Sequence, residues 1–93
     1  MIASFRNAAT KSIWTGAFTK ELPNQIQAVA RRKLRMIANA RWLDDLLIPP
    51  NNRLELLHGD RNGQHSIRIN DQWRICFFWN DGNPTEVEIS DYH

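Results

Sequence analysis

The chain has little of what marks disulfide-linked, fibrous or repetitive proteins. It contains 1 cysteine, 4 glycines and 4 prolines in 93 residues. A single cysteine excludes an intramolecular disulfide and a four-cysteine zinc site, so we expect a reducing compartment. The low glycine and proline content excludes collagen-like and low-complexity chains.

Long apolar runs are also missing. No stretch approaches the ~18 apolar residues of a membrane span, and Arg6, Asn7 and Lys11 interrupt the first fourteen residues, unlike a signal peptide. We therefore expect a soluble, cytoplasmic protein without membrane contact. Hydrophobic residues make up 42% and charged residues 24% of the chain, which is ordinary globular usage. The length fits one domain, residues 1–93.

Charge is distributed unevenly although the net charge is only +2. Residues 1–41 hold 8 basic and 1 acidic side chains, whereas residues 42–93 hold 4 basic and 9 acidic ones. Nine of the 12 basic residues are arginine, the side chain suited to bidentate phosphate contacts. This distribution hints at a nucleic-acid partner.

The order of elements predicts helices first and strands afterwards. We expect a short strand or packed segment at 2–5, a helix at 8–18, and a stronger helix beginning at 22–24 and ending with a last turn at 40–47. The segment 49–52, which reads PPNN, is expected to end all helix. Strands are expected at the positions 53–57, 64–70, 73–80 and 85–92. The predicted fold class is α+β, with two N-terminal helices packed on one face of a small, mostly antiparallel sheet.

One face of the second helix is basic, with Arg31, Arg32 and Arg35 opposite its apolar residues. A solvated helix surface and a docking surface for RNA or an acidic partner both fit this pattern.

The C-terminal strands place large apolar side chains on odd positions, which are predicted to face the helices. Residues on one face must also pair across strands, which selects a hairpin with Ile69 opposite Trp73 around a three-residue loop. Arg68 then lies opposite Arg74 with Cβ atoms about 5 Å apart, and two like charges so placed are destabilising unless neutralised. Either a bound anion or the carboxylate of Glu88, diagonal to Arg74, would neutralise them.

Other polar groups are predicted to gather near Arg74 on the even-numbered face. Ser90 lies opposite Arg74 in the extended register, Tyr92 and His93 follow at the strand end, and the loop with His58 and Arg61 can fold over the face. Metal-independent RNA cleavage needs such groups, because a 2′-hydroxyl loses a proton, the phosphate gains charge and the leaving 5′-oxygen receives a proton.

Simpler roles exist for single residues. His65 has core-side parity and is interpreted as a core histidine at the strand edge, and Asp91 shares that parity and can hydrogen-bond the backbone at the end of the sheet. No zinc-ligand cluster, phosphate-binding glycine motif or Ser-His-Asp arrangement is present, so we expect neither a metal nor a cofactor.

Two segments carry a family resemblance. Leu57–Phe77 reads LHGDRNGQHSIRINDQWRICF, and Val87–His93 reads VEISDYH. Together with MIASF at the start and VARRKL at 29–34, they resemble the HigB branch of the RelE/ParE toxin superfamily over nearly the whole chain. The resemblance implies a bacterial type II toxin whose fold is two N-terminal helices against a mostly antiparallel sheet.

The activity implied by this resemblance is endonucleolytic cleavage of messenger RNA at the ribosomal decoding site, which halts translation. The implied partner is a HigA-like helix-turn-helix antitoxin, and operator DNA is bound only through the toxin–antitoxin complex. Two other functions stay open. ParE relatives share the fold and inhibit DNA gyrase without RNA chemistry, and an inactive member would act only as a co-repressor.

The resemblance also implies roles for particular residues. Arg74 matches the arginine that stabilises the attacked phosphate, and Asp91, Tyr92 and His93 match the C-terminal catalytic cluster. One family member carries a histidine where this chain has Glu55 and a lysine where it has His58. The general base is therefore open between three candidates. Arg68, Arg61 and Glu55 are expected to help bind substrate, and Tyr92 to stack on or orient the nucleotide. The three candidate bases are Glu55, His58 and His93.

Overall fold

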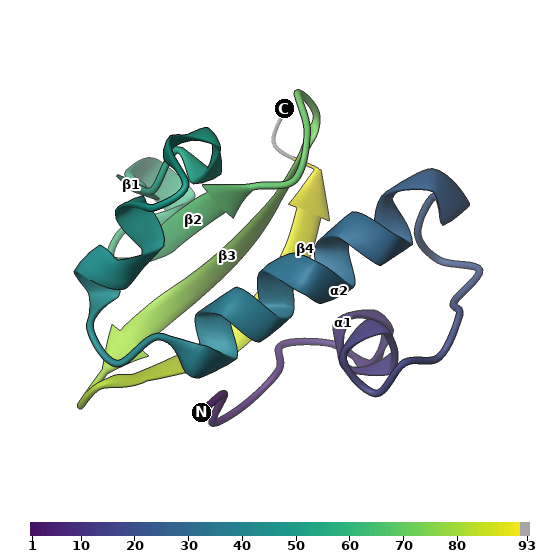
Figure 1. The fold of residues 1–93 in the computed structure, drawn as a ribbon, viewed down its shortest axis with the longest axis horizontal. Coiled ribbons are helices and arrows are strands. Elements are labelled where there is room, and N and C mark those ends of the chain that lie inside the picture. The colour runs from purple at the N-terminus through teal and green to yellow at the C-terminus, as the bar shows by residue number, and fades with distance from the viewer. Residues whose placement is uncertain (92–93) are drawn as a thin grey trace.

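The computed structural model describes residues 1–91 as two helices packed against a four-stranded antiparallel sheet. The helices are α1 (Ala8–Trp14) and α2 (Asn24–Asn39). The strands, in spatial order, are β1 (Glu55–Leu56), β2 (His65–Arg68), β3 (Trp73–Asn80) and β4 (Asn83–Asp91). Figure 1 shows α2 lying across the sheet with α1 beside it. The predicted α+β architecture is confirmed.

Local signals in the sequence explain where the helices begin and end. The Asn7 side chain caps α1 by accepting a hydrogen bond from the Thr10 N–H at 2.9 Å. α1 ends at Trp14, four residues before the predicted end at position 18. Gly16, with φ of +93°, follows this end. Pro23 precedes α2, whose buried residues recur at three- and four-residue steps.

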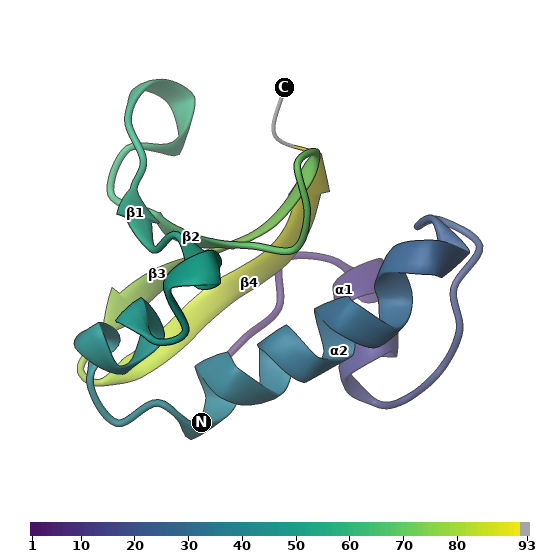
Figure 2. The same ribbon diagram turned by 45° about the horizontal axis from the view of Figure 1, so that its top comes forward.

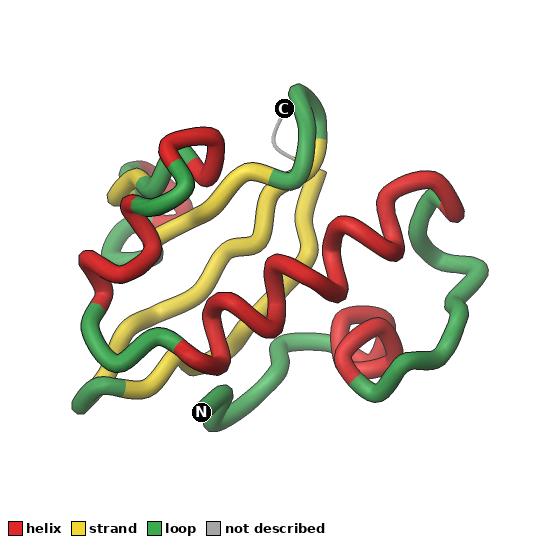
Figure 3. Tube along the Cα trace, viewed as in Figure 1, coloured by secondary structure: helices red, strands yellow, loops and turns green. Residues whose placement is uncertain are grey.

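Short 3-10 helices, drawn among the connecting segments in Figure 3, depart from the prediction. Ala40 is extended, so residues 43–47 form the separate helix η1 (Leu43–Leu47) rather than a last turn of α2. Two more are η2 (Pro50–Asn52), which lies inside the segment 49–52, and η3 (Gly59–Arg61), which follows it, so the expectation that this segment ends all helix was wrong. Proline fits the first turn of η2 because its missing N–H would have no partner there.

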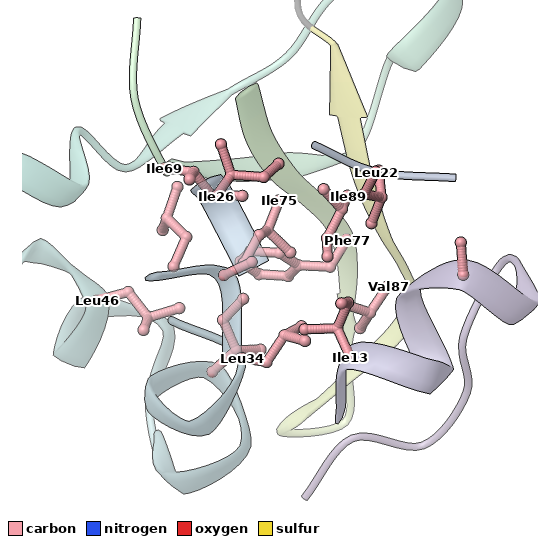
Figure 4. Packing of buried hydrophobic residues seen from close by; sticks show 14 of the residues in the cluster. Ile13, Leu22, Ile26, Leu34, Leu46, Ile69, Ile75, Phe77, Val87 and Ile89 are labelled. Carbon is pink, nitrogen blue, oxygen red and sulfur yellow. The ribbon is translucent and has the colours of Figure 1, made fainter. Parts of the chain in front are cut away.

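The odd-numbered apolar side chains of the sheet meet the helices in one core, as predicted. Phe77 and Ile75 from β3 are fully buried and lie against Leu34 of α2 and Ile13 of α1 (Figure 4). Ile69 donates its N–H to the Trp73 carbonyl at 2.9 Å, which confirms the three-residue hairpin loop. Arg68 lies opposite Arg74 and Ser90 lies on the other side of Arg74, again as predicted.

A β-bulge interrupts β4 where Glu86 adopts φ of +50° and the register with β3 shifts by one residue. The N-terminal segment pairs with β4 at this point. Phe5 forms a parallel bridge with Val87, and the Ala3 N–H donates to the Pro84 carbonyl at 2.8 Å. The predicted packed segment at 2–5 thus extends the sheet beside β4. In the described residues no helix combines the length and apolar character of a transmembrane span.

His65 lies at the edge of the core, which confirms its interpretation as a core histidine. Its half-buried ring lies 6.1 Å from that of Phe77, centroid to centroid, and burial lowers the pKa of the imidazole. The unfolded chain therefore takes up the His65 proton first as pH falls below the model-peptide value of ~6.5, so protonation favours unfolding.

Between pH 7.5 and pH 5, His65→Gln is expected to lose less unfolding free energy than the wild type, because the substitution removes this proton uptake. Urea titrations at the two pH values measure the difference. His58→Gln, which alters an exposed side chain, is the matched control and should follow the wild type. Equal losses in His65→Gln and the wild type would refute the role of His65.

Candidate functional site

The even-numbered face of the sheet, away from α1 and α2, carries the polar residues singled out in the sequence. Adjacent strands place Glu55, Ser66, Cys76 and Glu88 in one row across the sheet. In Figure 2 the loop with η3 rises at one side of the sheet, and the β2–β3 turn and the end of β4 rise at the other. The row lies between these two raised edges.

Arg74 is the buried cation of this face, with 8% of its surface exposed. Its Nε donates to the Ser66 hydroxyl at 2.7 Å, and one Nη donates to the Arg53 carbonyl, also at 2.7 Å. The Glu55 carboxylate lies 3.7 Å from the same Nη. A buried charge needs such partners, and they fix the plane of the guanidinium.

Arg68, although opposite Arg74 in the register, uses different partners. Its guanidinium pairs with Asp71 in the hairpin turn, whereas Arg74 turns toward Ser66 and Glu55. The like charges are therefore neutralised separately. The predicted alternative in which Glu88 neutralises them was wrong, because the Glu88 carboxylate pairs with Arg61 at 3.0 Å and with Arg6 at 3.8 Å.

The loop with η3 folds over the polar face and is held there by Arg61. One Nη of Arg61 donates to Glu88 and to Gln64, each at 3.0 Å, and the other donates to the Ser90 hydroxyl at 2.9 Å. His58 precedes η3 with an exposed side chain and has no hydrogen bond to a described residue. The structure thus brings Arg61, but not His58, into contact with β4.

The C-terminal candidates are placed only in part. Asp91 is exposed at the end of β4, opposite Trp73, and its carboxylate accepts a hydrogen bond from the Gln72 amide at 2.8 Å. This side-chain partner replaces the predicted backbone partner. Tyr92 and His93 lie outside the described residues.

Cys76 lies on this face among the charged side chains. Burial raises the pKa of its thiol, and four charged groups lie close enough to act on it. These groups are Arg61, Glu88, Arg74 and Arg6. A buried, protonated thiol is a weak nucleophile.

A second polar cluster, formed by Lys33 and Asn52, was missed in the sequence. Lys33, on α2, is buried and donates to the Asn52 carbonyl oxygen, while the fully buried Asn52 amide donates to the Leu46 carbonyl at 3.2 Å. Burial first, and then the charges of Arg32 and Arg68, lower the pKa of the Lys33 ammonium. The cluster holds Asn52 in place, and Asn52 directly precedes Arg53. The Arg53 carbonyl accepts a hydrogen bond from Arg74.

Signals for the missed residues differ. Ser66 has even parity and lies two residues before Arg68, the cross-strand neighbour of Arg74. This spacing marks Ser66 as a diagonal neighbour of Arg74. Nothing local marked Arg6 or the Arg53 carbonyl, since both reach the face through chain segments distant in sequence. The structure describes no group of three histidine, cysteine, aspartate or glutamate side chains that would hold a metal within residues 1–91.

The chain matches the family of HigB-like toxins, described as the RelE-like toxin of the type II toxin-antitoxin system HigB, over residues 3–93. The chain belongs to this family. Toxin HigB-1 of Vibrio cholerae is 44% identical over 61 residues, which are 66% of this chain and 64% of that relative. Endoribonuclease HigB of Proteus vulgaris is 30% identical over 96 residues, covering both proteins in full.

The fold of this toxin also occurs in a solved complex. The structure of the YoeB-YefM complex from Staphylococcus aureus matches with a TM-score of 0.61 at 15% identity, over 100% of this chain and 98% of that one. At this identity the likeness concerns the fold, and it agrees with the predicted RelE-like architecture.

Asn52→Ala is expected to lower the free energy of unfolding by about 2–4 kcal/mol, because Lys33 and the Leu46 carbonyl lose their buried partner. Urea unfolding measures the loss. The control is Asn51→Ala, an exposed neighbour in η2, expected within about 0.5 kcal/mol of the wild type. Equal effects of the two substitutions would contradict a structural role for the cluster.

Proposed function

We propose that this toxin cleaves messenger RNA on the translating ribosome in the bacterial cytoplasm, without a metal ion, and that an antitoxin restrains it. Support for an endoribonuclease comes from the family and from the Proteus vulgaris relative named Endoribonuclease HigB. The single structural observation that carries the proposal is the buried guanidinium of Arg74 beside the Glu55 carboxylate.

Arg74 is proposed to stabilise the attacked phosphate. Its Nε and one Nη bind protein acceptors, so the guanidinium is already oriented before RNA arrives. A preorganised cation stabilises charge that develops in the transition state, and it needs little reorganisation to do so. Arg68 is proposed to bind the strand more weakly, since Asp71 already pairs with it.

Glu55 is proposed as the group that removes the 2′-hydroxyl proton. Its side chain is 48% exposed, so a bound RNA strand can reach its carboxylate, which lies 3.7 Å from the Arg74 guanidinium. His58 has no partner that would hold its ring in one position among the described residues. Asp91, Tyr92 and His93 remain proposed contributors, with His93 suited to protonate the leaving 5′-oxygen.

Arg61 is proposed to hold the site in its conformation in addition to binding RNA. It ties the loop with η3 to Glu88 and Ser90, and so keeps the loop beside the strand that carries the C-terminal cluster. The proposed antitoxin is HigA-like, in accord with the family, and operator DNA would be bound only by the toxin–antitoxin complex.

Arg74→Ala is expected to abolish cutting, because the phosphate loses its buried cation. The measurement is a map of messenger RNA 5′ ends after brief expression in cells, with wild type, Arg74→Ala and His93→Ala compared. Lys20→Ala, which removes an exposed cation from the α1–α2 connection, is the control and should cut like the wild type. Growth arrest by the wild type without new 5′ ends would rule out the nuclease and redirect attention to gyrase.

Glu55→Gln is expected to slow single-turnover cleavage on programmed ribosomes by about 10²–10⁴-fold, the usual contribution of a general base. His58→Gln should slow it much less. The reverse order would assign proton removal to His58, and a small effect of both substitutions would assign it to the C-terminal cluster.

A further inference from the structure

A basic cavity lies beside the site, where the N-terminal segment turns into α1. Its volume is about 480 Å³. Arg6 and Lys11 are the charged side chains among its lining, which contains no carboxylate. Lys11 is exposed and pairs with no described carboxylate, and the Arg6 side chain is 51% exposed. The remaining lining residues are Ala3, Ser4, Phe5, Asn7 and Ala8.

Arg6, which lines the cavity, also reaches the face that carries Arg74. Arg6 approaches Glu88 at 3.8 Å, and Glu88 binds Arg61, which in turn binds Ser90 opposite Arg74. The buried Cys76 thiol lies within electrostatic reach of Arg6, Arg61 and Arg74 together. Figures 1 and 2 show the N-terminal segment leading past β4 into α1.

Arg6 and Lys11 have few charge partners among the described residues. Arg6 shares the Glu88 carboxylate with Arg61, and Lys11 pairs with no described carboxylate. The position of the segment does not need these side chains, because the Arg6 N–H donates to the Val87 carbonyl and Ser4 accepts from the Val87 N–H. An arginine and a lysine in one cavity without a carboxylate favour a phosphate ligand.

Strand geometry separates this cavity from Arg74. Arg6 lies on the segment beyond β4 and Arg74 on β3, two residues farther along the sheet. With ~4.8 Å between strands and ~3.3 Å per residue, their backbones lie roughly 12 Å apart. The Arg74 guanidinium turns away from β4, toward Ser66 and Glu55, whereas Arg6 lies beyond β4, so the cavity suits a different phosphate of the same strand.

We propose that the cavity lined by Arg6 and Lys11 binds a backbone phosphate of the RNA strand that flanks the phosphate being cut. This assignment rests on the proposed ribonuclease function. It gives the toxin a second anchor on the substrate, which aligns the strand with Arg74 independently of base identity.

The test uses programmed ribosomes and messenger RNAs in which one phosphate at a time, on either side of the cut, is replaced by a neutral methylphosphonate. For the wild type, one flanking replacement is expected to raise the toxin concentration at half-maximal cleavage about 3- to 10-fold. Arg6→Gln and Lys11→Gln should raise it similarly on unmodified RNA, with no further rise when that same phosphate is neutral. Lys20→Gln is the control, and its effect should be the same on every RNA.

Two results would overturn the assignment. In the first, Arg6→Gln and Lys11→Gln leave the toxin concentration at half-maximal cleavage unchanged. In the second, each variant raises that concentration by the same factor on every methylphosphonate RNA as on unmodified RNA, which means that the cavity binds none of the replaced phosphates. In both cases the wild type still cuts and Arg74→Ala does not, so the proposed function survives. A wild type that does not cut, or an Arg74→Ala variant that does, removes the proposed function and this assignment with it.

Discussion

The polar face of this toxin depends on the burial of one guanidinium. Arg74 lies on the central strand β3, and its exposed fraction is only 8%. A cation so placed is stable only with acceptors in fixed positions, and the chain supplies a hydroxyl from β2 and a carbonyl from the 49–55 segment. That requirement ties the sheet to the segment that carries Glu55.

The Lys33–Asn52 cluster extends this constraint to the helix layer. Asn52 has its amide and its carbonyl oxygen engaged, and Lys33 connects it to α2. The helix is itself held by the core around Phe77 and Leu34. A shift of α2 would therefore move the carbonyl that orients Arg74, so packing on one face of the sheet controls charge geometry on the other.

The basic and acidic halves of the sequence lie side by side in the folded chain. The basic N-terminal half and the acidic C-terminal half meet where Arg6 reaches Glu88, 82 positions later in the chain. The pairing at β4 brings these segments together. The polar face consequently contains cations and carboxylates from both halves of the chain, and Arg6, which reaches this face, also lines the cavity proposed to bind a phosphate.

The sequence by itself determined the fold class, the strand register and the pairing of Arg68 with Arg74. These follow from the two-residue periodicity of strands, because a slip by one residue would turn Ile75 and Phe77 toward solvent. Only the tertiary structure decided which carboxylate meets which arginine, and where Asn52, Arg6 and the Arg53 carbonyl lie. Side chains of arginine and glutamate are long enough to reach neighbouring strands. Odd or even position in a strand therefore predicts the face of the sheet on which they lie, but not the residue they contact. A backbone carbonyl that binds a side chain has no signature in the sequence. The β-bulge at Glu86 likewise depends on a long-range contact, the hydrogen bond from the Glu86 N–H to the Ser4 hydroxyl.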